Sequence, residues 1–105
     1  MPHYLSQVSY TPEAWARLVA NPQDRIEAVR GPIEKLGGRI HNAFFAFGEY
    51  DVVVITEMPD NVSAAAVALA VGQGGGATVK TVVLIPPEDM DKAGKKSVDY
   101  RPPGR

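Results

Sequence analysis

Few residues of this chain could carry out chemistry, because it has no cysteine and only two histidines, His3 and His41. An imidazole titrates near neutral pH and is the natural general acid or base. Tyr50 and Asp51 add a phenol and a carboxylate at a Gly-Glu-Tyr-Asp turn between two apolar runs. If those runs form a hairpin and His41 points inward, His41 and Asp51 would form an acid/base pair. The plainer interpretation is that Asp51 satisfies backbone N–H groups, Tyr50 packs the end of the fold, and His41 is a half-exposed edge or interface residue.

Metal and cofactor sites are not indicated by the spacing of these groups. A metal site would need both histidines and carboxylates, and His3 and His41 follow no ligand motif. The glycine run at 72–76 follows a helical segment and leads into a strand, whereas phosphate-binding loops precede a helix. We therefore predict no metal and no organic cofactor.

The elements that must position these residues follow the order β-α-β-β-α-β. Thr11 and Pro12 mark a helix start, Asn21-Pro22 breaks that helix and offers a second cap, and Gly31-Pro32 should kink or interrupt its continuation. The order is typical of a ferredoxin-like α+β domain, with helices on one face of a four-stranded antiparallel sheet. We expect strands at 4–10, 39–47, 51–57 and 78–85 and helices at 12–36 and 62–71. On strand two, alternation places His41 on the same face as Ala43 and Phe45, with Asn42 opposite.

The central hairpin is apolar on both faces. Phe44 and Phe45 are neighbours on one strand, and every residue of 52–55 on the next strand is apolar. One layer of helices can cover only one face of a sheet. The second face therefore needs another chain, and we expect a homodimer or larger assembly in which sheets face each other.

Length and composition set the remaining bounds. A chain of 105 residues forms one domain, which we place at 1–87, followed by a polar tail at 88–105. The net charge of -1 offers no basic surface for nucleic acid. The first residues do not read as a signal peptide, and the longest apolar run is too short to cross a membrane, so we expect a cytoplasmic protein.

Two short motifs resemble those of the GYD-domain family. They are Leu36-Gly37-Gly38-Arg39 at a helix end and Gly48-Glu49-Tyr50-Asp51 at the turn that follows the next strand, and Val67-Ala68-Leu69-Ala70 is also similar. The resemblance covers roughly residues 4–84. It implies a dimeric α+β barrel built from two ferredoxin-like sheets, and it implies no particular reaction.

Three functions remain open. The leading hypothesis is an oligomer that binds a small, partly apolar molecule between the sheet and a partner subunit, in a cleft lined by Tyr4, His41, Phe45, Tyr50 and Asp51. The second is an oxygenase or isomerase without organic cofactor, in which His41 and Asp51 are the acid/base pair. The third is a structural or regulatory assembly module without a ligand. A mostly apolar pocket favours the first, converging polar groups with shifted pKa values favour the second, and a filled interface favours the third.

Overall fold

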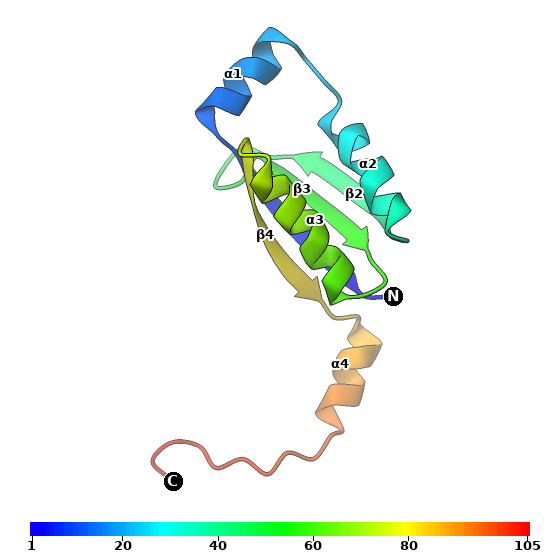
Figure 1. Ribbon diagram of the computed structural model, residues 1–105. Helices are drawn as coiled ribbons and strands as arrows, with labels where there is room; N and C mark the ends of the chain where they lie inside the picture. The colour runs from blue at the N-terminus through cyan, green and yellow to red at the C-terminus, as the bar shows by residue number, and fades with distance from the viewer.

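The computed structural model describes residues 1–105 and contains one antiparallel sheet of four strands (Figure 1). The strand order is β2-β3-β1-β4, so β1 and β3 form the middle of the sheet. This is the ferredoxin-like arrangement that the sequence predicts. The strands are β1 (His3–Tyr10), β2 (Arg39–Phe45), β3 (Val52–Glu57) and β4 (Ala77–Leu84).

Four helices complete the chain, and the first three begin at a residue whose side chain accepts a backbone N–H. Thr11 caps the first helix, as predicted. The predicted break at Asn21-Pro22 is confirmed, but the cap of the second helix is Asp24. The helices are α1 (Pro12–Ala20), α2 (Arg25–Lys35), α3 (Asn61–Gln73) and α4 (Pro87–Gly94).

Helix α2 continues through Pro32. The interruption that we expected there does not occur. A proline ring clashes with the Cβ of the preceding residue when that residue is helical. Gly31 has no Cβ, so this clash is absent, and the remaining costs are the hydrogen bond that a proline nitrogen cannot donate and the contact of its ring with the carbonyl one turn earlier.

Helix α2 ends in a Schellman motif built from the Leu-Gly-Gly sequence. Gly37 has a φ of 88°, in the left-handed region that favours glycine. Its N–H donates to Glu34 O at 2.9 Å, and the Gly38 N–H donates to Ile33 O at 3.0 Å. These bonds turn the chain from α2 directly into β2.

Helices α2 and α3 cover one face of the sheet, and the core lies between them and the strands (Figure 1). Alternate residues of β3 are buried there, together with Tyr4 of β1. Only eight of 105 residues are buried, which is few for a domain of this length. We call the opposite side of the sheet, which no helix of the chain covers, the open face.

Beyond β4 the chain leaves the sheet, and α4 and the following residues extend away from it (Figure 1). Helix α4 has no buried residue. The radius of gyration is 17.2 Å, whereas a compact domain of this length has about 13 Å. No helix combines the length and apolar character needed to cross a bilayer.

Candidate functional site

Asp51 joins the β2–β3 turn to the end of β1 and the start of α1. Its Oδ2 accepts the backbone N–H of Tyr10 at 2.9 Å and the indole N–H of Trp15 at 3.3 Å. Its own backbone N–H donates to Val8 O at 2.8 Å. The rings of Tyr10 and Trp15 meet edge to face with centroids 5.3 Å apart. These contacts favour the structural interpretation of Asp51.

His41 lies at an irregularity in the β2–β3 ladder. The register shifts between Ile40, which pairs with Thr56, and Asn42, which pairs with Ile55. The extra residue is His41, and its Nε2 lies 3.2 Å from Glu57 Oε1. His41 therefore turns to the open face. The prediction that His41 shares a face with Ala43 is wrong, because a bulge inserts one residue and breaks strict alternation.

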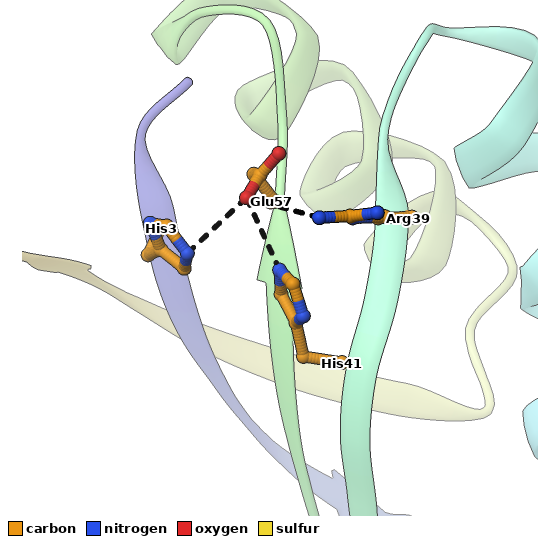
Figure 2. Close-up of polar contacts among 4 residues, drawn as sticks. All are labelled: His3, Arg39, His41 and Glu57. Atoms are coloured by element: carbon orange, nitrogen blue, oxygen red, sulfur yellow. Dashed lines mark hydrogen bonds and ion pairs between the residues drawn. The ribbon is translucent and has the colours of Figure 1, made fainter.

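A cluster of three side chains forms around Glu57 on the open face (Figure 2). His3 Nε2 and His41 Nε2 each lie 3.2 Å from Glu57 Oε1. The two imidazole rings stack, with centroids 5.2 Å apart and an interplanar angle of 17°. Arg39 Nη2 approaches the same oxygen at 3.9 Å. We call His3, His41 and Glu57 the histidine–glutamate cluster.

The surroundings of Glu57 favour its ionised form. The hydrogen bond with His41 lowers the pKa of the Glu57 carboxyl most, and the positive charges of Arg39 and His3 lower it further. Partial removal from water acts in the opposite direction, but the net pKa is below its ordinary value. The carboxylate therefore stays charged and can hold two imidazole N–H groups or a cation.

Strand pairing explains why these residues converge. His3 at the start of β1 pairs with Glu57 at the end of β3, and Arg39 at the start of β2 pairs with the same residue from the other side. Neighbouring strands in an antiparallel sheet run in opposite directions, so the start of one lies beside the end of the next. The predicted element order contains this signal, but the site residues predicted from the sequence do not include His3 or Glu57.

The five residues expected to line one cleft do not surround a common space within this chain. His41 contacts Glu57 at one end of β3, whereas Asp51 precedes its other end. Tyr4 is buried under the helices and donates its hydroxyl to Asn61 Oδ1. Phe45 pairs with the buried Val52 at the end of β2, and Tyr50 lies half-buried in the turn. Their roles remain predictions.

A cavity with a volume of about 490 Å³ lies on the helix side, between α1, α2 and α3. Ten of its 16 lining residues are hydrophobic. Its only charged side chains are Arg17 and Arg25, and no carboxylate or histidine lines it. Its size lies in the range of small-molecule sites. We call it the helix-side cavity.

Residues 4–93 match the sequence model of the GYD domain family. The match covers all of the sheet except His3, together with most of α4, so it extends further along the chain than the motifs alone suggest. The comparison with curated proteins finds no match. The chain belongs to the GYD domain family, as its Leu-Gly-Gly and Gly-Glu-Tyr-Asp motifs indicate.

Proposed function

We propose that this member of the GYD domain family is a homo-oligomer whose subunits each bind a small, largely apolar molecule with an anionic group. The observation that carries the proposal is the helix-side cavity, with its apolar wall and two arginines. This location differs from the cleft between sheet and partner subunit that the sequence predicts. The expected ligand class is the same, with an anionic group added.

The charges of the cavity support an anionic ligand. Neither Arg17 nor Arg25 forms an ion pair with a carboxylate. Arg25 instead donates to the amide oxygen of Gln23 at 3.3 Å. A guanidinium offers several N–H donors in a fork that matches a carboxylate or phosphate. A ligand with an apolar body and such a head group would fill the wall and satisfy at least one guanidinium.

Oligomerisation is supported by the surface that one chain exposes. Phe44 on the open face is 65% exposed. Further apolar side chains share this face, because their strand partners alternate with the buried positions: Leu5, Val53, Ile55, Val82 and Leu84. A second sheet of the same kind would cover them.

The two other hypotheses receive less support. An enzyme that uses His41 and Asp51 as an acid/base pair requires them to be close, and within one chain they lie toward opposite ends of β3. An assembly module without a ligand predicts a filled interface and no cavity, and the helix-side cavity is unfilled by side chains. Ligand binding therefore fits the geometry best.

The test is a fluorescence titration with 8-anilinonaphthalene-1-sulfonate, an apolar anion whose emission rises in dry sites. We expect saturable binding of one dye per chain. Ala70→Phe should reduce the affinity at least tenfold, because Ala70 lines the cavity on α3 and a phenyl ring would occupy it. Arg17→Gln combined with Arg25→Gln should also weaken binding, whereas Arg101→Gln in the tail is the matched control.

Equal affinity in all of these variants, with circular dichroism showing that they are folded, would reject the cavity as the binding site. Native mass spectrometry of the protein purified from its own host then reports the natural ligand and the number of subunits in one measurement.

A further inference from the structure

We propose that the histidine–glutamate cluster binds one divalent first-row transition metal ion on the open face. His3, His41 and Glu57 come from three different strands, and their ligand atoms all lie within 4.8 Å of one another. Two imidazole nitrogens and one carboxylate oxygen form a donor set found in zinc sites and in non-haem ferrous sites. This site is separate from the helix-side cavity and does not depend on the proposed ligand.

The distances within the cluster suit a shared ion. Each Nε2 lies 3.2 Å from Glu57 Oε1. Ligands bound at about 2.0–2.2 Å in tetrahedral or octahedral geometry are separated by roughly 3.0–3.5 Å. A metal ion could therefore be bound with small side-chain rotations and no movement of the strands. Both Nε2 atoms would give their lone pairs to the ion instead of donating protons to the carboxylate.

The backbone holds these ligands in place. His3 and Glu57 are direct partners in the β1–β3 ladder. His41 reaches the same side only because of the β-bulge, since strict alternation from Ala43 would point it toward the helices. Bulges occur often beside functional sites, where they redirect one side chain. The irregularity thus produces the third ligand.

In the single chain, the site has room for further ligands. The His3 and His41 side chains are 36% and 30% exposed, and the Glu57 side chain is 16% exposed. The imidazoles approach one oxygen of the carboxylate from the open face (Figure 2). Three protein ligands with one or more open positions are typical of a catalytic or exchangeable metal site rather than a closed structural one.

Arg39 provides an internal check on this inference. Its Nη2 lies 3.9 Å from Glu57 Oε1, and its side chain is 65% exposed. A guanidinium this close repels a bound dication and competes for the same carboxylate. Arg39→Gln should therefore strengthen metal binding a few-fold, whereas it should weaken a purely structural cluster.

The experiment is isothermal titration of the full chain with zinc chloride, repeated with cobalt(II) chloride and read by visible absorption. We expect one ion per chain with a dissociation constant of about 10 μM or tighter. His3→Gln, His41→Gln and Glu57→Gln should each weaken binding at least tenfold. Glu49→Gln, a carboxylate at the opposite end of the hairpin, is the matched control and should have no effect.

Three results would overturn the site: no saturable binding up to about 1 mM zinc, equal affinity in the ligand variants, or half an ion per chain. Circular dichroism identifies any variant that fails to fold. If the ligand variants do not fold, the zinc affinity of Arg39→Gln decides, because a few-fold gain in affinity supports the site and a loss of affinity contradicts it. Arg17→Gln with Arg25→Gln should leave zinc binding unchanged. Failure of the metal site is therefore distinguishable from failure of the helix-side cavity.

Discussion

Gly38 should tolerate no side chain, and Gly38→Ala is the sharpest test of the packing between α2 and β3. A Cβ placed on Gly38 would lie 2.4 Å from Met58 Sδ and 2.6 Å from the backbone oxygen of Glu57. Atoms in ordinary contact are about 3.5–4.0 Å apart. The substitution therefore forces two neighbours to move by roughly an ångström.

The cost follows from what those neighbours are. Met58 is 2% exposed and belongs to the core cluster with Tyr4 and Ile33, so its thioether has little free space. The Glu57 oxygen is backbone at the end of β3, and no change of rotamer can relieve that contact. Overpacking of this kind costs about 1–3 kcal/mol. We expect the upper part of this range, about 2–3 kcal/mol, because one of the two contacts is with backbone.

The measurement is urea unfolding followed by circular dichroism, at one protein concentration because association adds to apparent stability. In a parallel heating experiment, the thermal midpoint should fall by roughly 8–12 °C. Gly72→Ala is the matched control. Gly72 lies near the end of α3, and a Cβ placed on it would have no other atom within 4 Å. Alanine there should be neutral or stabilise by up to about 1 kcal/mol.

A Gly38→Ala protein as stable as the wild type, with an unchanged dependence on urea, would refute the close approach of α2 and β3. Equal destabilisation by Gly72→Ala would also count against the argument, since backbone flexibility rather than contact would then explain the loss.

Three further outcomes are expected. The Ser63 N–H lowers the pKa of Asp60 below its ordinary value of 3.8, so this carboxylate stabilises α3 above that pH and the stabilisation is lost as pH falls through the lowered pKa. Urea midpoints measured against pH should show wild type falling more steeply than Asp60→Asn below pH 4; parallel curves would contradict this. Ile55→Lys on the open face should raise the subunit dissociation constant at least tenfold in sedimentation equilibrium, and a wild-type monomer at low concentration would contradict the proposed assembly. Asp51→Ala should cost about 1–3 kcal/mol, because two N–H groups lose their acceptor, and should change the near-ultraviolet dichroism of Trp15; an unchanged Trp15 signal would argue against the contact.

The sequence predicts the element order well because local signals mark its boundaries. Thr11-Pro12 starts a helix, Asn21-Pro22 ends it, and Gly37-Gly38 stops the next. The sequence misplaces the cap of α2 because Asn21 and Asp24 are equally good capping residues by type, and only the path of the chain selects Asp24.

The candidate sites are less accessible from the sequence. Convergence of His3 and Glu57 follows from antiparallel pairing once the strand ends are known. The orientation of His41 does not follow from strand pairing, because a single extra residue in β2 reverses it and no local sequence pattern predicts that residue. The helix-side cavity depends on how α1, α2 and α3 pack, which is a tertiary outcome that periodicity does not encode.

Two acidic residues mark the ends of β3, Asp51 just before the strand and Glu57 as its last residue, and they have a consequence for strand alignment. Every residue of 52–55 is apolar, so a shift of β3 along β1 by one or two positions would still place apolar side chains on both faces of the sheet. Hydrophobic patterning therefore cannot choose among the alternatives. Asp51 binds the Tyr10 N–H at one extremity, and Glu57 meets His3 at the other. A slipped pairing would lose both contacts, so these carboxylates favour the native alignment over shifted, aggregation-prone pairings of a strand whose central residues are all apolar.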